Sequence, residues 1–526
     1  MSLEKNFTIS HSIRRYERLQ WRIVTLMSDI PDARPTNPAA EHGPTAIKTR
    51  CMGQMNQPTL PSISAALLLA ASLTAQAGTS EPETTVSVPP NYTGMSVDTA
   101  TSVVNRSWSE QFRSEELNTL LRECDRGNLD LNAATLRVRE ALARGQAARS
   151  VLWPHLDGSA NVAQYAGRSG SNSARETDSG LLLNASYEID FWGRNRAALQ
   201  ASDALITLSR ADRAALALTT RSAVISAYFN VLALRERIAL AQVDLRSAEQ
   251  ALGAVLARQT AGTANVTEVA LERSSVATAR LVIPDLQEQA ASALVALAVL
   301  VGRDPEGFDI QAQDLSGVAE PEIAASLPSE LLKRRPDVAS AAAALAAAAA
   351  DLRGAEASLF PSLSLTLSGG VQNPAVQAAV TTLSGTGAAI TLGGQITQTL
   401  FDAGRRKAVR EEARLRHYEL TLAYRRAVRN ALLDVELALS HRQSLLTQDA
   451  ERKASRQQTR LALEAAQSRY RAGSGDFLSL LESERGAHSA QDQDVQYRLA
   501  RLQSLISLAK ALGGGWDVGA LSDREP

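Results

Sequence analysis

The chain has 526 residues and a net charge of −1, because 55 Lys and Arg residues face 56 Asp and Glu residues. This balance leaves no electrostatic footprint for nucleic acid, so no nucleic-acid partner is expected. Two cysteines, Cys51 and Cys124, cannot form a disulfide framework or a multi-cysteine metal site. Aromatic residues make up only 4% of the chain, and alanine-rich runs such as 341–350 favour long, closely packed helices over a compact enzyme core.

Residues 1–77 are predicted to be an N-terminal extension and a signal peptide. The apolar run 63–73 is too short to cross a bilayer as a helix. Lys48 and Arg50 precede it, and Ala75-Gln76-Ala77 supplies a small-x-small cleavage pattern, which puts the mature start near Gly78. A buried Ala/Leu-rich helix is the alternative.

The first half of the chain then continues with a helix and two strands, at 155–165 and 181–191. In the second strand, apolar residues alternate with a mostly polar set, which is the period of a strand with one apolar face. The apolar series is Leu181, Leu183, Ala185, Tyr187, Ile189 and Phe191. Glu188 and Asp190 fall on the polar face and are expected to line a lumen. A soluble sheet with one wet face would show the same alternation.

A very long helical hairpin is predicted at 193–302. Apolar residues along its first helix follow a strict three-four spacing, which is the seam of a coiled coil. They are Val224, Ala227, Val231, Leu234, Ile238, Ala241, Leu245, Ala248, Leu252 and Val255. A helix from Arg194 to Ala257 would be roughly 95 Å long. Gly262 marks the turn, and Pro284 predicts a kink in the returning helix.

The second half repeats this order, with a helix that begins at Pro336, strands at 362–372 and 388–401, and a hairpin at 404–512. Asp130, Leu152, Pro154 and Leu156 recur 207 residues later, and Gly193, Arg194 and Gly262 recur 211 residues later. These matches fall where elements begin or end. The sequence therefore predicts two internal repeats.

Aromatic residues gather at the junctions between helices and strands, where a membrane barrel carries its girdle. They are Trp153, Phe191, Trp192, Phe360 and Phe401. This clustering favours a membrane barrel over a soluble sheet. Four strands cannot close a barrel, and an open edge in lipid is costly, so copies of the chain must associate.

Several stretches together resemble the TolC/NodT-type outer-membrane factor family. They are Trp108–Leu131, Tyr187–Arg194 (YEIDFWGR), Leu327–Val338, Leu400–Arg405 (LFDAGR), Arg469–Gly473 (RYRAG) and Ala511–Trp516 (ALGGGW). Their order and spacing are specific, and the resemblance covers almost the whole mature chain. The first and last stretches resemble most the branch that serves resistance-nodulation-division pumps. Thr79 departs from that branch, where many members carry a lipidated cysteine, so the barrel alone is the expected anchor.

The resemblance implies a mixed α and β membrane protein. Three protomers would form a twelve-stranded β-barrel, four strands each, continued by a long α-helical coiled-coil barrel. The implied function is the outer-membrane channel of a tripartite efflux system, a passive exit duct for drugs, other toxic compounds or metal ions. An inner-membrane pump and a periplasmic adaptor would deliver them. The implied location is the outer membrane of a Gram-negative bacterium, with a large periplasmic part. A duct for type I protein secretion is the alternative.

With the resemblance, the chain divides into six parts. These are the extension and signal peptide 1–77, an N-terminal equatorial segment 78–127, the first repeat 128–302, an equatorial linker 303–334, the second repeat 335–515 and a C-terminal tail 516–526.

Two kinds of functional residue follow from the resemblance. The hairpin turns, Ala261-Gly262-Thr263 and Ala472-Gly473-Ser474, would meet the adaptor, although any helix reversal needs such a glycine. Glu482 matches a position where the family often has an acidic residue that narrows the closed aperture, and Ser479 stands at the neighbouring acidic position. Three copies of Glu482 near one axis would favour cations, whereas a Glu on a solvated helix face is the ordinary alternative.

No enzyme is predicted. The six histidines form no metal-binding pair on a helix, and neither a GxSxG nor a phosphate-loop motif occurs. No catalytic residue, cofactor or metal is therefore expected. A soluble periplasmic coiled-coil adaptor without a pore is the alternative of another class, but it leaves the alternating strands and their aromatic ends unexplained.

Overall fold

The computed structural model describes residues 108–169, 172–321, 332–371 and 389–516. All of these belong to the unit Gly78–Pro526. The predicted extension 1–77, most of the segment 78–127 and the tail beyond residue 516 therefore lie outside the described residues.

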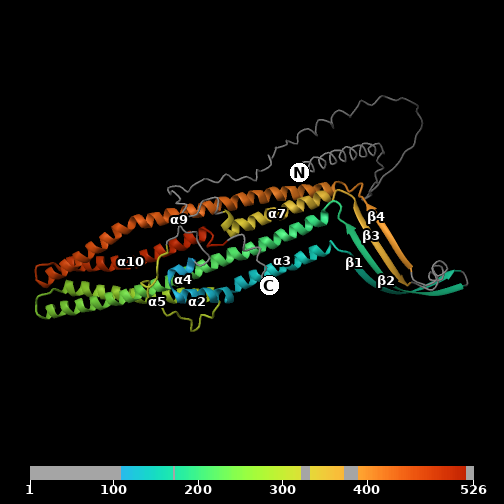
Figure 1. The fold of residues 1–526 in the computed structure, drawn as a ribbon. Coiled ribbons are helices and arrows are strands. Elements are labelled where there is room, and N and C mark those ends of the chain that lie inside the picture. The colour runs from blue at the N-terminus through green and yellow to red at the C-terminus, as the bar shows by residue number, and fades with distance from the viewer. Residues whose placement is uncertain (1–107, 170–171, 322–331, 372–388, 517–526) are drawn as a thin grey trace, which may run out of the picture. The chain divides into compact units, whose positions relative to one another are not determined.

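Long helices and one sheet make up the described part of this unit (Figure 1). Its first half contains η1 (Trp108–Phe112), α2 (Glu115–Gly127), α3 (Leu129–Ser150), β1 (His155–Ser169), β2 (Asn172–Ile189), α4 (Arg194–Thr260) and α5 (Val266–Val301). Its second half contains α7 (Pro336–Ala357), β3 (Ser362–Val371), β4 (Ala389–Thr397), α9 (Arg405–Arg471) and α10 (Phe477–Ala511). The order helix, strand, strand, long helix, helix thus occurs twice.

The seam predicted for α4 is confirmed, because none of its ten positions is exposed. Val224, Val231, Leu234, Ala241 and Val255 are buried, and the other five positions are half-buried. α4 packs along α5, and α9 packs along α10, so each pair forms a hairpin. We call α4–α5 the first hairpin and α9–α10 the second hairpin. α5 continues through Pro284 without interruption, and a kink there stays a prediction.

The four strands form one antiparallel sheet in the order β1-β2-β3-β4. In its register Ala185 lies opposite both Leu156 and Leu367, and Leu367 lies opposite Leu392. Residues directly opposite each other share a face, so the apolar series predicted for the second strand lies on the same side of the sheet as the apolar residues of the other three strands.

The predicted strand lengths were wrong for the first strand pair. β1 runs on to Ser169 and β2 begins at Asn172, so their ladder continues past the pair Leu181–Val371, where β3 ends. This extension could not be predicted, because residues 172–179 are mostly polar and lack a two-residue period. β4 ends at Thr397, four residues before the predicted end.

The prediction that Asp190 lines a lumen was also wrong. β2 ends at Ile189, and the Asp190 carboxylate accepts hydrogen bonds from the backbone N–H groups of Asn195 (3.1 Å) and Arg196 (2.9 Å). It therefore caps α4. Asp402 does the same for α9 through the N–H of Arg406 (3.2 Å). A carboxylate is stabilised there because the first turn of a helix presents unpaired N–H groups.

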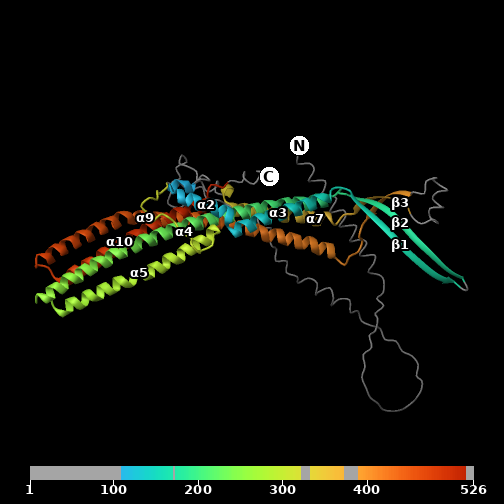
Figure 2. The same cartoon turned by 90° about the horizontal axis from the view of Figure 1, so that it is seen from below.

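The largest hydrophobic cluster lies where η1 and α2 pack against the middle of α4 and the ends of α5 and α10. Phe112, Leu117, Phe229 and Leu297 are fully buried in it. Arg335 precedes Pro336, the first residue of α7 as predicted, and joins that helix to α9 and α10. This packing fixes the roots of both hairpins and leaves their tips to project away from it (Figures 1 and 2).

Candidate channel wall and hairpin tips

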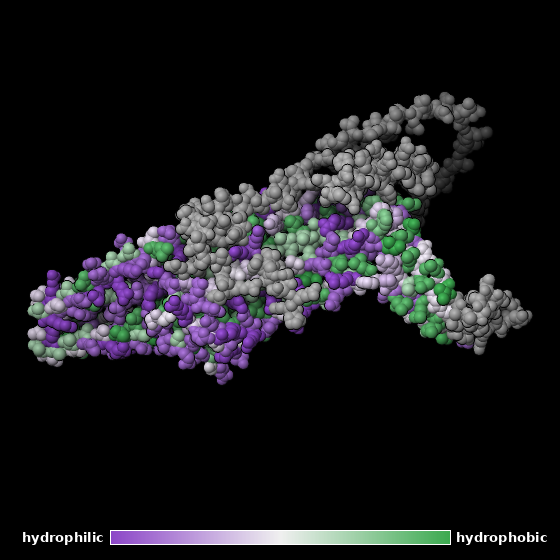
Figure 3. Space-filling view, viewed as in Figure 1, coloured by the Kyte–Doolittle hydropathy of each residue, from purple (hydrophilic) through white to green (hydrophobic). Residues whose placement is uncertain are grey.

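The apolar face of the sheet is exposed in the single chain. Ile390 is 81% exposed and Leu392 is 76% exposed, and large aliphatic residues on β1, β2 and β3 share that face. Figure 3 shows the sheet largely in the hydrophobic colour, whereas polar residues dominate the helices beside it. The opposite face carries Asn184, Ser186, Thr366 and Thr391, so one side is suited to lipid and the other to water.

The sheet has two open edges. Within the residues that the structure describes, β1 pairs only with β2, and β4 pairs only with β3. About nine backbone N–H and C=O groups of the nine-residue strand β4 point away from β3. In hydrocarbon each unpaired group costs several kcal/mol, which in sum exceeds the roughly 5–15 kcal/mol that stabilises a whole domain. The sheet of one chain therefore cannot form a closed membrane barrel by itself.

The residues predicted for the aromatic girdle lie at the ends of the strands. Trp153, Phe191 and Phe401 are 70–80% exposed. Trp192 stacks on Phe360 with ring centroids 4.5 Å apart, and its indole N–H donates to the carbonyl oxygen of Pro361 (2.8 Å). Strand ends from the two halves of the chain thus meet at this stack. Their contact with lipid headgroups stays a prediction.

The two glycine turns lie at the same end of the molecule (Figure 2). Gly262 and Gly473 have φ angles of 76° and 72°, in the left-handed region that side chains other than glycine rarely adopt. The backbone N–H groups of Thr263 and Ser474 donate hydrogen bonds to carbonyl oxygens of the preceding helix, which closes each turn. All six predicted docking residues are exposed. A Cβ added at either glycine would meet no atom within 4 Å, so backbone conformation rather than packing requires glycine there.

A contact between the hairpins holds these tips together, and sequence reasoning missed it. The guanidinium of Arg258 on α4 donates a hydrogen bond to the Tyr470 hydroxyl on α9 and lies 4.8 Å from the centroid of that ring. Val255, Val269, Phe477 and Leu481 form a buried cluster beside the pair. The two residues lie 212 positions apart, so no local pattern could have revealed the contact.

The predicted aperture residues lie just beyond the second turn. Glu482 and Ser479 are both exposed on α10, three residues apart and therefore on one side of that helix. The backbone N–H of Ser479 donates to the Asp476 carboxylate (3.3 Å), which caps the helix. Whether copies of Glu482 meet at an axis stays a prediction.

A second group of charged residues between the hairpins was also missed. A cavity of about 430 Å³ lies between α4, α5 and α10, and its lining includes Asp244, Glu484, Arg485 and His488. Glu272 on α5 lies next to Glu484 and is 1% exposed, with neither carboxyl oxygen hydrogen-bonded. In the described part of the chain, no group of three or more His, Cys, Asp or Glu side chains could hold a metal ion.

Comparison with known proteins decides the family. The sequence model of the outer membrane efflux protein family matches residues 120–303 and 327–514. These ranges take in both strand pairs and both hairpins. The chain belongs to this family.

Two relatives of this outer membrane efflux protein carry names that refer to different transported substances. The chain is 38% identical over 429 residues to the pyoverdine export outer membrane protein OpmQ of Pseudomonas aeruginosa, which covers 80% of this chain and 89% of the relative. It is 29% identical over 422 residues to the cation efflux system protein CusC of Escherichia coli K12, which covers 80% of this chain and 91% of the relative. Both relatives are named for export or efflux, and the chain is an outer membrane protein, as the resemblance implied.

A solved structure agrees with this fold. The open state of the Neisseria gonorrhoeae MtrE outer membrane channel is 28% identical, with a TM-score of 0.73. The match covers 83% of this chain and 97% of that one. The resemblance found in the sequence is thus confirmed, and the protein is an outer membrane efflux channel with a mixed, mainly helical fold.

Proposed function

We propose that three copies of this outer membrane efflux protein form a passive exit duct. In it a twelve-stranded barrel crosses the outer membrane and the helical hairpins continue as a periplasmic tunnel. The observation that carries the proposal is the four-stranded sheet with one apolar face and two open edges. At least about eight strands are needed to close a membrane barrel, and three copies supply twelve.

The helices support the same assembly, because α5 of the first hairpin and α9 of the second hairpin both carry exposed aliphatic side chains along their length. Leu281 and Val299 on α5 are 72% and 60% exposed, and Leu415 and Leu437 on α9 are 56% and 60% exposed. In a ring, α5 of one protomer would pack against α9 of the next and would remove both sets from water. α4 and α7 each contain a stretch apolar enough to cross a membrane, but they pack along each other among the helices, so we do not assign them as spans.

The test is to purify the full chain in detergent, measure its mass and record its conductance in a planar bilayer. A trimer that inserts and conducts steadily is expected. A folded monomer that stays dissolved without detergent contradicts the proposal, and so does its release from membranes by a carbonate wash, as expected of a soluble adaptor.

The proposed cargo is small molecules or metal ions, delivered by an inner-membrane pump of the resistance-nodulation-division type through a periplasmic adaptor. Its support is that relatives are named for pyoverdine export, cation efflux and antibiotic efflux. Protein secretion is the less favoured alternative. The duct itself performs no reaction in this proposal, since selection belongs to the pump.

Adaptor docking is proposed for the exposed turn residues 261–263 and 472–474. Replacing both turns with unrelated tight turns that keep Gly262 and Gly473 should leave the trimer and its conductance intact. Export in cells that supply the pump and adaptor should fall to the level of the deletion strain. Preserved export in such cells would argue against docking at these turns.

The proposed aperture predicts an effect on ion selectivity. Glu482→Gln removes one negative charge per protomer, so the preference of the open channel for cations over anions should fall severalfold. Reversal potentials in a potassium chloride gradient measure this. Glu464→Gln, an exposed glutamate on α9 with an ion-pair partner in its own helix, is the matched control. Unchanged selectivity in Glu482→Gln would place this residue outside the aperture.

A further inference from the structure

Ionic contacts join the two hairpins of one chain from the middle of α4 towards its tip. Glu236 pairs with Arg498, and the guanidinium Nε of Arg237 lies 2.5 Å from the Asp492 carboxylate. Nearer the tip, Asp244 on α4 pairs with the imidazole of His488 on α10. All three contacts link α4 to α10, so they hold the first hairpin to the second hairpin.

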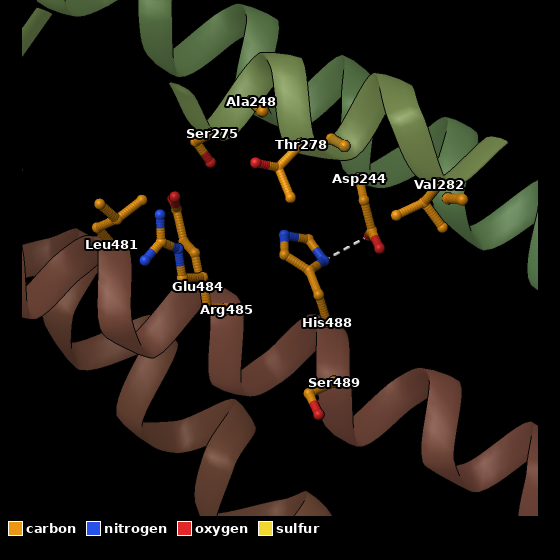
Figure 4. Close-up of a pocket in the computed structure, with 12 residues that line it drawn as sticks. Asp244, Ala248, Ser275, Thr278, Val282, Leu481, Glu484, Arg485, His488 and Ser489 are labelled. Atoms are coloured by element: carbon orange, nitrogen blue, oxygen red, sulfur yellow. Dashed lines mark ion pairs between the residues drawn. The ribbon is translucent and has the colours of Figure 1, made fainter. Parts of the chain in front are cut away.

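Four of the acidic and basic residues near the tip form one group, which we call the clasp: Asp244, Glu272, Glu484 and His488. Figure 4 shows His488 reaching from α10 towards Asp244 on α4. Glu484 and Arg485 in the same view lie at the end of the cavity marked by Ser275 of α5. The clasp thus draws on α4, α5 and α10, and three of its members, Asp244, Glu484 and His488, line a cavity of about 430 Å³ between these helices.

Glu272 has the least favourable surroundings for a charge. It is 1% exposed, neither of its carboxyl oxygens has a hydrogen-bond partner, and another carboxyl, Glu484, lies next to it. Arg485 is the nearby cation, but it is exposed to water. A buried, unpaired carboxylate is expensive, so the packed hairpins favour the protonated acid at Glu272.

The other groups around the clasp complete its electrostatics. Gln467 of α9 hydrogen-bonds Glu484, and Asp244 and Glu484 face His488 from α4 and from its own helix. Towards the tip, Glu268 and the Arg258–Tyr470 pair adjoin Glu272. These residues lie on the helical hairpins and outside the strands assigned to the membrane.

The direction of proton binding is the same for three members of the clasp. Burial raises the pKa of Glu272, and Glu484 raises it further, while Arg485 lowers it. Burial also raises the pKa of Glu484 against the effects of His488 and Gln467. The hydrogen bond to Asp244 raises the pKa of His488, and burial opposes it. Each of these three groups therefore binds its proton more tightly with the hairpins packed than apart. The packing of the hairpins should be most stable at acid pH and should weaken as the pH rises through the pKa values of these groups in the packed state.

We propose that the clasp is a proton-operated latch between the two hairpins: bound protons hold α5 and α10 together, and proton loss releases them. The latch is a property of one chain. Its consequence, a periplasmic mouth that loosens as the pH rises, rests on the proposed function.

Hydrogen exchange of the purified full-length protein in detergent tests the latch without pump, adaptor or export. Exchange is followed by mass spectrometry in the segments 264–283 and 477–492 between pH 5 and pH 8, with each rate divided by that of the same segment in the unfolded chain. In the wild type, the normalised exchange should be at least about threefold faster at pH 8 than at pH 5.

Glu272→Gln keeps the shape of the side chain but cannot ionise, so it should lose most of this pH dependence and stay protected at pH 8. Glu484→Gln should act in the same direction. Glu288→Gln, an exposed glutamate further along α5 and outside the clasp, should behave as the wild type does. Wild-type exchange that does not change with pH overturns the latch, as does a full pH dependence retained in both clasp variants. Equal loss of the pH dependence in Glu288→Gln also overturns it, because the effect would then not be specific to the clasp. A duct that fails to conduct leaves these results unaffected.

Discussion

Leu392→Arg is expected to prevent stable assembly in the outer membrane. Leu392 lies in the middle of β4 on the apolar face and is 76% exposed in the single chain. An arginine on the lipid face near the middle of the bilayer costs about 2–4 kcal/mol, and a trimer carries this cost in each copy. The folded trimer in outer-membrane fractions, measured by native gel electrophoresis, should fall to a small fraction of the wild-type amount.

Thr391→Arg is the matched control for this change. Thr391 is the next residue of the same strand, lies opposite Ser368 on the polar face and is also exposed. If that face lines water, the trimer should form in near-normal amounts, with altered conductance as the main effect. Similar losses in both variants, or a larger loss in Thr391→Arg, would contradict the assignment of the two faces.

The second large effect is expected at Arg335, which joins three helices of the second half. Its guanidinium contacts the carboxylates of Asp337 (2.7 Å) and Asp434 (2.8 Å) and donates to the carbonyl oxygen of Ala511 (3.1 Å). Arg335 itself is 8% exposed. Although burial raises the pKa of Asp337, hydrogen bonding and charge from Arg335 hold it below its usual range. Removing the cation would leave partly buried carboxylates and a carbonyl without their partner.

Arg335→Ala should therefore lower the free energy of unfolding by about 2–3 kcal/mol, because hydrogen bonds to charged groups contribute about 1.5–3 kcal/mol and the carboxylates left behind are 44% and 50% exposed. Arg335→Lys should cost less, because it keeps the charge but loses the forked geometry. The loss of helical circular dichroism in urea measures both. Arg303→Ala is the control, since Arg303 pairs with Glu123 on the surface and should cost no more than about 1 kcal/mol. Equal effects of Arg335→Ala and Arg303→Ala would show that the buried network does not stabilise the helices.

Much of the fold could be predicted because its signals are periodic and local. The three-four spacing along α4 and the glycines at both turns indicated two long hairpins, and α4 begins at Arg194, as predicted. The alternation in the second strand placed Leu183 on its apolar face before any register was known, and the register then put Leu365 and Leu392 on the same side. The position of a residue within such a period decides which face of its helix or strand the side chain lies on, whichever element packs against that face.

The candidate sites were predictable only where they coincide with those local signals. The turns at Gly262 and Gly473 were found because a helix reversal needs left-handed backbone. Glu482 came from a family resemblance, and its role stays a prediction. The clasp gave no signal, because Glu272 and His488 look like ordinary residues of solvated helices until α5 and α10 are brought together.

The sequence by itself determined which segments become helix or strand, which face of each is apolar and where the chain reverses. Only the tertiary structure decided that Arg258 meets Tyr470, that Asp190 caps α4 instead of facing a lumen, and that Glu272 is buried without a partner. The physical reason is the range of the interactions. Backbone hydrogen bonds and side-chain periods act over a few residues, whereas contacts between hairpins join positions about two hundred residues apart. Which residues meet in these contacts depends on how two helices of 67 residues each are aligned along one another. A local sequence pattern does not contain that alignment.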